Sequence, residues 1–304
     1  MAASGGSKAI VAALLANAGV AVAKFVGFLI TGSSSLLAES VHSVADSGNQ
    51  GLLLWGSKAG RKEADDERPF GYGRERYFWS FVVALVLFAL GSLFSIYEGL
   101  KKLADPHEIE SLSVAVVILS LAILLEGFSF RTAIKEATPL KGKLGWWQFI
   151  RRSRNPELPV VLLEDFGALI GLVVALIGVL LAAIVDPVFD AYATLVIGAL
   201  LGVIAAILAI EMKSLLIGET AAPEAAATIR STLSAHPDVE AVLRMRTLHV
   251  GPEDLLVGAK LEITGTLSFD EVAVLVTQLQ TAVRAAVPEA TYIYLEPGMA
   301  RAEA

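Results

Sequence analysis

The stretch Leu36–Trp55, LLAESVHSVADSGNQGLLLW, decides how this chain folds. It is 20 residues long, about the length that a helix needs to cross a bilayer. Yet four polar residues lie within it at spacings of three, four and three: Glu39, His42, Asp46 and Asn49. On a helix these side chains share one face. Because ionisable groups at membrane depth are costly and usually mark a site or a pathway, we predict a membrane helix that carries a functional site.

His42 and Asp46 are one helical turn apart, and a histidine and a carboxylate so placed can bind one divalent metal ion. The chain has no cysteine, which excludes disulfides and thiolate metal sites. Any metal ion would therefore be held by nitrogen and oxygen atoms. Such ligands suit Zn²⁺, and they also accept Mn²⁺, Fe²⁺ or Co²⁺.

The composition indicates a membrane protein. The chain has 304 residues, of which 55% are hydrophobic, and its mean hydropathy is +0.65. Apolar runs of spanning length predict a polytopic α-helical domain over 1–217 with six transmembrane helices in the lipid bilayer. These runs lie at about 8–30, 36–57, 77–100, 112–133, 160–184 and 190–217.

The basic residues predict the orientation. Six Lys and Arg lie in 56–76 and seven in 131–159, whereas the segments on the opposite side hold few. Because positive loops stay inside, both termini are expected in the cytoplasm, and we expect an integral protein of the plasma membrane. The net charge of −7 is concentrated after residue 217, where there are twelve acidic and six basic residues, so a nucleic-acid partner is excluded.

Other charged residues fall in or beside the predicted spans. Lys24 could tune the site or pair with a carboxylate, but we expect it to extend toward the outer interface. Glu126 could be a network carboxylate or a proton carrier, but we expect it to pair with nearby Arg131. Asp186 and Asp190 flank a short outer turn and could attract cations at the exit, but we expect them to act as a cap and a turn residue.

Glu164 and Asp165 are adjacent carboxylates near the start of the fifth predicted span. Adjacent side chains on a helix diverge by about 100°, so only one of them can face the polar stripe fully. The other is expected to face a neighbouring helix or water. Gly167 and Gly171 form a small-residue face that permits close helix approach.

Residues 218–304 have the composition of a soluble domain. A helix at 223–236, strands at 239–250 and 254–264, a helix from the Ser268–Glu271 capping box to about 287, and a strand at 291–297 are predicted. This order, αββαβ, is typical of a ferredoxin-like α+β fold with helices on one face of the sheet. The histidines of this domain are expected in a loop and a strand, without a metal.

These features together resemble the cation diffusion facilitator family, and in particular the branch of mitochondrial zinc-transporter-like members. The most specific motifs are SSSLLAESVHSVADSGNQ at 33–50 and PFGYGRERYFW at 69–79. The resemblance implies a tetrahedral metal site at mid-membrane with His42, Asp46 and Asp165 as ligands. Val161 stands where many members have a fourth ligand, so Glu164 is the nearest candidate to replace it. We expect Glu39 and Asn49 to be accessory polar residues of this site.

The resemblance also implies an activity. It indicates a homodimeric antiporter that exports a divalent metal, most readily Zn²⁺, in exchange for protons, with no catalytic residues and no resident cofactor. Residues 218–304 would be a cytoplasmic dimerisation domain, and Arg74 and Glu219 a charge pair between subunits. RPFGYG at 68–73 replaces the common HPFGHG, so the accessory metal site of that loop is expected to be absent.

Two other functions are compatible with parts of the sequence. The loss of a ligand at Val161 and of the accessory sites motivates a membrane-embedded metal-binding scaffold or regulator that does not transport. An intramembrane metallohydrolase is disfavoured because the chain has no paired-histidine motif such as H-E-x-x-H.

Overall fold

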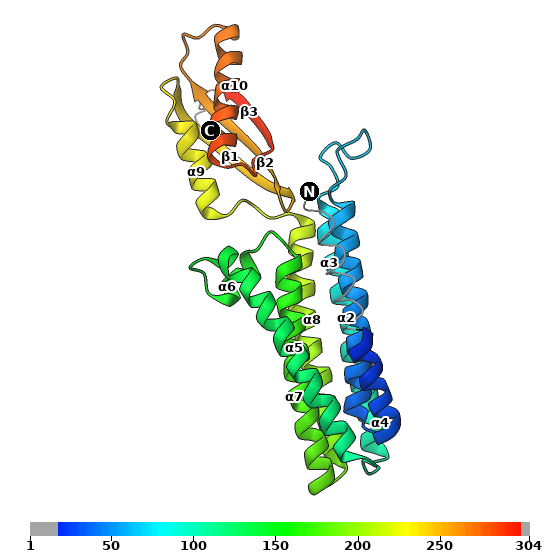
Figure 1. Cartoon of the computed structure of the whole chain (residues 1–304). Helices are drawn as coiled ribbons and strands as arrows, with labels where there is room; N and C mark the ends of the chain where they lie inside the picture. The colour runs from blue at the N-terminus through cyan, green and yellow to red at the C-terminus, as the bar shows by residue number, and fades with distance from the viewer. Residues whose placement is uncertain (1–17, 299–304) are drawn as a thin grey trace, which may run out of the picture. The chain divides into compact units, whose positions relative to one another are not determined.

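The computed structural model describes residues 18–298, which form two compact units (Figure 1). The helical unit contains the described residues up to Ser57, then Phe78–Arg151 and Pro156–Met212. The sheet unit contains Lys58–Tyr77, Arg152–Asn155 and the described residues from Lys213 onward. The two connections at 58–77 and 152–155 thus belong to the sheet unit although they lie far from it in sequence.

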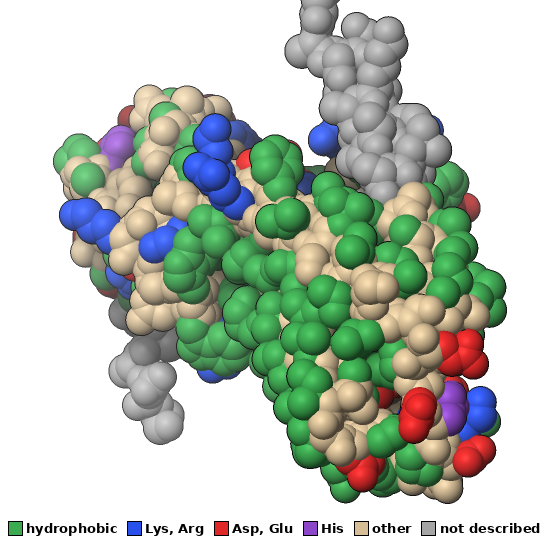
Figure 2. Space-filling model, turned by 60° about the horizontal axis from the view of Figure 1, so that its bottom comes forward, with side chains coloured by type: hydrophobic (Ala, Val, Ile, Leu, Met, Phe, Trp, Pro, Cys, Tyr) green, Lys and Arg blue, Asp and Glu red, His purple; other side chains and the backbone are tan. Residues whose placement is uncertain are grey.

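The membrane-like part of the fold is built of long helices. They are Ala18–Thr31, α2 (Ser34–Ala59), α3 (Arg74–Val86), η1 (Leu87–Leu93), α4 (Phe94–Ala104), α5 (Leu112–Lys141), α6 (Trp146–Arg152), α7 (Glu157–Ile184) and α8 (Val188–Ile217). Figure 2 shows hydrophobic side chains covering much of the visible face of this unit.

Among the described residues, four helices have the length and apolar composition that crossing a membrane requires: Arg74–Ala104, Leu112–Lys141, Glu157–Ile184 and Val188–Ile217. They correspond to four of the six predicted spans. Helix α2 has 26 residues, but its polar stripe lowers its hydropathy. The first predicted span, 8–30, is described only from residue 18 onward. The structure therefore shows a helical, membrane-like unit, and the six crossings of the membrane remain a prediction.

The span Arg74–Ala104 is continuous but not uniform, because the seven residues of η1 form a π-helix between α3 and α4. The wide turn lies where this helix meets α8 closely. The Ser92 hydroxyl donates to the carbonyl oxygen of Gly198 at 2.8 Å. A Cβ placed on Gly198 would lie 2.8 Å from a side-chain carbon of Ile96, so the two backbones approach closely here.

A buried carboxylate on α8 holds the start of α2. Asp190 accepts hydrogen bonds from the backbone N–H of Ser34 at 2.7 Å and from the hydroxyls of Ser33 and Ser35 at 2.8 and 2.5 Å. Asp190 takes part in the outer turn as expected, since its N–H donates to the carbonyl oxygen of Pro187 at 3.3 Å, and its carboxylate also satisfies the free donors of a distant helix N-terminus. Asp186 does act locally, since it accepts from the N–H of Val188 as a cap residue does.

The sheet unit follows the expected order of elements. These are α9 (Pro223–Ser234), β1 (Val239–Gly251), β2 (Asp254–Ile263), α10 (Phe269–Ala286) and β3 (Tyr292–Gly298). The strand order is β1-β2-β3, with β1 and β2 antiparallel and β2 and β3 parallel. The Ser268–Glu271 capping box is present at the start of α10. Both helices contribute to one core with the sheet, through Ile229, Leu233, Leu275, Leu279 and Val283 among others.

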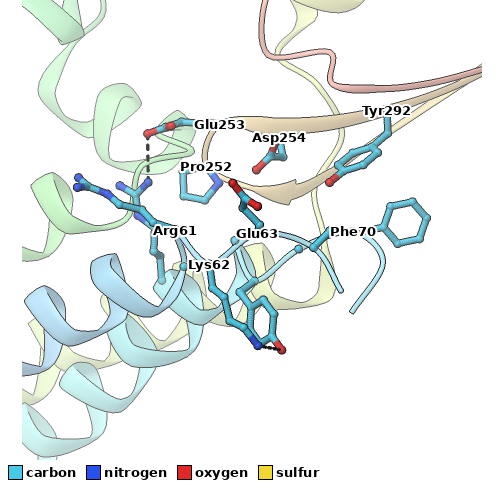
Figure 3. A pocket seen from close by; sticks show the side chains of 14 residues that line it. Arg61, Lys62, Glu63, Phe70, Pro252, Glu253, Asp254 and Tyr292 are labelled. Atoms are coloured by element: carbon cyan, nitrogen blue, oxygen red, sulfur yellow. Dashed lines mark hydrogen bonds and ion pairs between the residues drawn. The ribbon is translucent and has the colours of Figure 1, made fainter. Parts of the chain in front are cut away.

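The connection Lys58–Tyr77 packs on the sheet within the same unit (Figure 3). The rings of Phe70 and Tyr292 meet edge to face with centroids 5.2 Å apart. A guanidinium nitrogen of Arg76 lies 3.3 Å from a carboxylate oxygen of Glu253 in the turn between β1 and β2. Together these contacts enclose a polar cavity of about 320 Å³.

The same connection is stabilised internally by Tyr72. Its hydroxyl donates to Asp65 at 2.7 Å and accepts from the Lys62 ammonium at 2.7 Å. The hydrogen bonds from Lys62 and Tyr72 hold the pKa of the Asp65 carboxyl well below its usual range. The bonds to Asp65 and Tyr72 raise the pKa of Lys62. The side chains of Lys62, Asp65 and Tyr72 thus form hydrogen bonds with one another within this connection.

Candidate metal site

The polar stripe of α2 faces the interior of the helical unit. Glu39, His42 and Asn49 are fully buried, and the side chain of Asp46 is 16% exposed. Nε2 of His42 lies 3.4 Å from Oδ2 of Asp46, as expected for residues one turn apart. The sequence-based prediction that these four side chains share an inward face agrees with this structure.

Lys24 is also buried, and its expected extension to the membrane surface was wrong. Its ammonium donates to Glu39 at 3.2 Å and to the hydroxyl of Ser43 at 2.7 Å. A lysine extends to the interface when no partner is near, whereas here a carboxylate lies within reach inside the bundle. The charge of Glu39 is therefore compensated from the first described helix.

Glu164 and Asp165 of α7 diverge as their adjacency predicts. Glu164 accepts a hydrogen bond from the Nδ2 amide of Asn49 on α2 at 2.7 Å. Asp165 accepts from the hydroxyl of Ser129 on α5 at 3.0 Å. One carboxylate thus faces the polar stripe and the other a neighbouring helix.

Glycines of α7 bring these helices together. A Cβ placed on Gly171 would lie 2.5 Å from Oε1 of Glu39, so α2 and α7 can approach this closely only without that atom. A Cβ on Gly167 would lie 2.6 Å from a side-chain carbon of Ile204 on α8. The small-residue face expected from the sequence therefore permits close approach of both α2 and α8.

Three carboxylates from three helices line one small cavity: Asp46 of α2, Glu126 of α5 and Asp165 of α7. Its volume of about 10 Å³ is roughly what a single water molecule occupies. The rest of the lining is polar and consists of Ser43, Gln50 and Ser129. Such a cavity offers several oxygen donors inside the helical unit.

The expectation that Glu126 pairs with Arg131 was wrong, since no ion pair joins them in the described part of the chain. Glu126 and Arg131 are five residues apart, so on a helix they point in different directions. Glu126 and Ser129 are three apart and share the face that meets α7. That spacing is the signal in the sequence that could have assigned Glu126 to the site.

Several ligand-type atoms of α2 are buried without a hydrogen-bond partner. They are Oε1 of Glu39, both ring nitrogens of His42, Oδ1 of Asp46 and Oδ1 of Asn49. Unsatisfied buried polar atoms are rare and call for an explanation such as an ion or water. Within residues 18–298, however, no three His, Asp or Glu side chains are near enough together to hold a metal ion. The predicted ligands thus lie on facing helices without forming such a group.

The remaining predicted residues lie in the sheet unit. Glu219 forms an ion pair with Arg154 of the same unit, and its carbonyl oxygen accepts from the N–H of His249 at 2.8 Å. His249 is buried in β1, and burial lowers its pKa to about 4. His236 lies 3.6 Å from Asp238. The two histidines thus occupy a turn and a strand, as the sequence indicated.

The helical part of the chain matches a known family model. The model of the cation efflux transmembrane domain matches residues 10–217. The human proton-coupled zinc antiporter SLC30A9, mitochondrial, is 30% identical over 265 residues, which are 86% of this chain and 46% of the relative. Metal tolerance protein C4 of Arabidopsis thaliana is 28% identical over 263 residues, 86% of this chain and 58% of the relative.

A bacterial relative is covered more fully. Magnetosome protein MamB of Paramagnetospirillum magneticum is 25% identical over 268 residues, 88% of this chain and 85% of the relative. By contrast, the chain spans about half the length of the SLC30A9 relatives that it matches.

These relatives correct the expected location. Four SLC30A9 proteins at 30–31% identity are named as mitochondrial, which contradicts the plasma membrane expected from the sequence. The physical reason is that hydropathy and loop charge fix how helices lie across a bilayer. They carry little information on which membrane that is.

Proposed function

Because the chain belongs to the cation diffusion facilitator family, we propose that it is an antiporter of a divalent metal cation and protons, with Zn²⁺ as the preferred ion. The match to a cation efflux transmembrane domain supports a transporter rather than an enzyme. The preference for Zn²⁺ and the coupling to protons are supported by relatives named as proton-coupled zinc antiporters.

We propose His42, Asp46 and Asp165 as metal ligands. The observation that carries this proposal is the small cavity where Asp46 and Asp165 meet, one turn from the unpartnered ring nitrogens of His42. Closure by small movements of α2 and α7 would bring one nitrogen and several oxygens to one ion, a set that Zn²⁺ accepts.

The fourth donor is Glu164 in this proposal. It replaces the ligand lost at Val161 once Asn49 releases its hydrogen bond to the carboxylate. Glu126 is the competing donor, because it already lines the cavity. Glu39 and Asn49 act as accessory residues. Glu39 compensates the charge of Lys24, and Asn49 orients Glu164.

Proton coupling follows from competition at the ligands. A metal ion binds only deprotonated carboxylates and neutral imidazole, so protons and metal exclude each other from one site. If the site opens to each side of the membrane in turn, this competition suffices for exchange. We propose that metal and protons cross the membrane in opposite directions.

The proposed assembly is a homodimer in a lipid bilayer. Residues 1–217 would cross the membrane six times, and 218–304 would form a dimerisation domain with ferredoxin-like topology. The αββαβ order and the parallel pairing of β2 with β3 support this topology. Arg74 and Glu219 remain the proposed pair between subunits, in which Glu219 would exchange its bond to Arg154.

The test is metal uptake into proteoliposomes that hold a pH gradient, with Zn²⁺, Mn²⁺, Fe²⁺ and Co²⁺ compared. We expect uptake by the wild type to be lost in Asp46→Ala and in Glu164→Gln. Glu136→Gln removes an exposed carboxylate of α5 outside the cavity and should transport normally. Loss in Glu126→Gln with normal Glu164→Gln would instead assign Glu126 as the fourth donor. Unchanged uptake by Asp46→Ala, or none by the wild type, would refute the proposal and favour the scaffold.

A further inference from the structure

The segment Lys141–Arg152, KGKLGWWQFIRR, takes no part in the proposed transport site. It contains four basic residues and no acidic one, and it includes α6; we refer to it as the α6 segment. Trp146 and Trp147 are 40% and 53% exposed although they are among the largest apolar side chains. Exposed aromatic rings beside basic side chains are unusual on a surface that meets only water.

The α6 segment is fixed to three helices of the helical unit. Phe149 is buried and shares a core with Ala133 and Ala137 of α5 and Leu162 of α7. The Nε of Arg151 donates to Glu211 of α8 at 3.2 Å. Figure 1 shows α6 as a short helix set outside the bundle, beside the end of α5. The two tryptophans are therefore held in place by a packed base.

The contacts of Phe149 indicate how deep the α6 segment lies in the lipid bilayer. The apolar stretch of α5 ends at Phe130, before Arg131. At about 1.5 Å per residue, Ala133 and Ala137 lie roughly 5 and 10 Å beyond that point along the helix. A headgroup layer is about 5–8 Å thick on each side of the hydrocarbon core. The α6 segment thus lies at the level of the lipid headgroups.

Its chemistry suits one kind of lipid. The ammonium of Lys141 lies 5.2 Å from the ring centroid of Trp146, and Lys143 is exposed beside it. Tryptophan places its ring at the boundary between headgroups and acyl chains, while lysine attracts negative charge at the membrane surface. We propose that the α6 segment binds anionic phospholipids. Lys141 and Lys143 contact the headgroup phosphate, and Trp146 and Trp147 lie against the upper acyl chain.

The test uses the full-length protein with Trp55→Phe and Trp79→Phe, so that Trp146 and Trp147 are its only tryptophans. It is placed in mixed micelles with phosphatidylglycerol or phosphatidylcholine that carry brominated acyl chains, which quench tryptophan fluorescence. We expect phosphatidylglycerol to quench at a lower mole fraction than phosphatidylcholine. Each lysine near a membrane surface contributes about fivefold in affinity, so Lys141→Gln/Lys143→Gln should weaken phosphatidylglycerol binding roughly 25-fold. The control Lys101→Gln/Lys213→Gln removes the same charge outside the α6 segment and should leave the dependence of quenching on phosphatidylglycerol mole fraction unchanged.

Two results would overturn the inference. Equal quenching by both lipids would show that the segment senses apolar chains alone. Displacement of phosphatidylglycerol by millimolar inorganic phosphate, lost in the Lys141→Gln/Lys143→Gln protein, would show a site for free phosphate and not for a membrane. Because quenching reports binding directly, the result does not depend on whether the protein transports metal. A thermal unfolding scan in detergent shows whether each variant remains folded.

Discussion

The buried ion pair between Lys24 and Glu39 makes a specific prediction about stability. Removing either partner leaves the other as an uncompensated charge inside the helical unit, because both side chains are fully buried. Removing both takes away the attraction and the unpaired charge together. We therefore expect the double variant Lys24→Met/Glu39→Gln to lose less stability than the two single variants lose when their losses are added.

The magnitude follows from the distance. At 3.2 Å between Nζ and Oε2, two unit charges attract by about 5 kcal/mol at an effective dielectric constant of roughly 20. Breaking one side of a buried pair typically destabilises by about 3–5 kcal/mol. The double variant Lys24→Met/Glu39→Gln should lose less than the sum of the single variants, by at least about 2 kcal/mol.

The assay is reversible unfolding in mixed detergent micelles, with the free energy of unfolding measured for the wild type, both single variants and the double variant. Lys101 and Glu98 provide the control, because their pair is 3.7 Å long and the lysine is 65% exposed. Their coupling should stay below about 1 kcal/mol. Additive losses at Lys24 and Glu39 would refute the reasoning and show that each charge is compensated independently.

Three further predictions concern single residues. Gly171→Ala should lower the free energy of unfolding by about 1–3 kcal/mol, because its Cβ would lie 2.5 Å from Oε1 of Glu39. Gly127→Ala, where nothing lies within 4 Å, should not, and equal losses in the same unfolding assay would contradict this. Asp190→Ala should lose about 1–3 kcal/mol, since the first N–H groups of α2 lose their acceptor; an unchanged melting temperature would contradict it. His249 is neutral when buried with a pKa of about 4, whereas the unfolded chain takes up its proton near pH 6.5. The sheet unit should therefore lose stability, up to about 3 kcal/mol, as the pH falls from 6.5 to 4; circular dichroism melts of wild type and His249→Phe should diverge over that range.

Local patterns in the sequence predicted much of the fold. The stripe from Glu39 to Asn49 needs only the helical period, and it is buried on one face as expected. The Ser268 capping box depends on residues three apart, and the structure contains it. The divergence of Glu164 from Asp165 follows from the angle between neighbours on one helix. Each of these features is decided within a few residues.

Features that join distant segments could not be predicted in this way. The partner of Lys24 is 15 residues away on another helix, and Asp190 lies more than 150 residues from the serines that it holds. Helix α5 also continues to Lys141, beyond the apolar stretch that ends at Phe130 and beyond the predicted span of 112–133. Hydropathy reports where lipid ends, whereas a helix continues through residues such as Ala, Glu and Lys that favour it.

The π-helix at Leu87–Leu93 interrupts the regular α-helical repeat of the span Arg74–Ala104. A π segment accommodates about one extra residue, which turns everything after it by roughly 100° relative to a straight α-helix. The residues that α4 buries, among them Ser95, Glu98 and Lys102, point inward only because of that added turn. Deleting one residue between 87 and 93 would therefore leave the length of the span almost unchanged while rotating these polar side chains toward the lipid. In this span, insertions and deletions matter more than most substitutions.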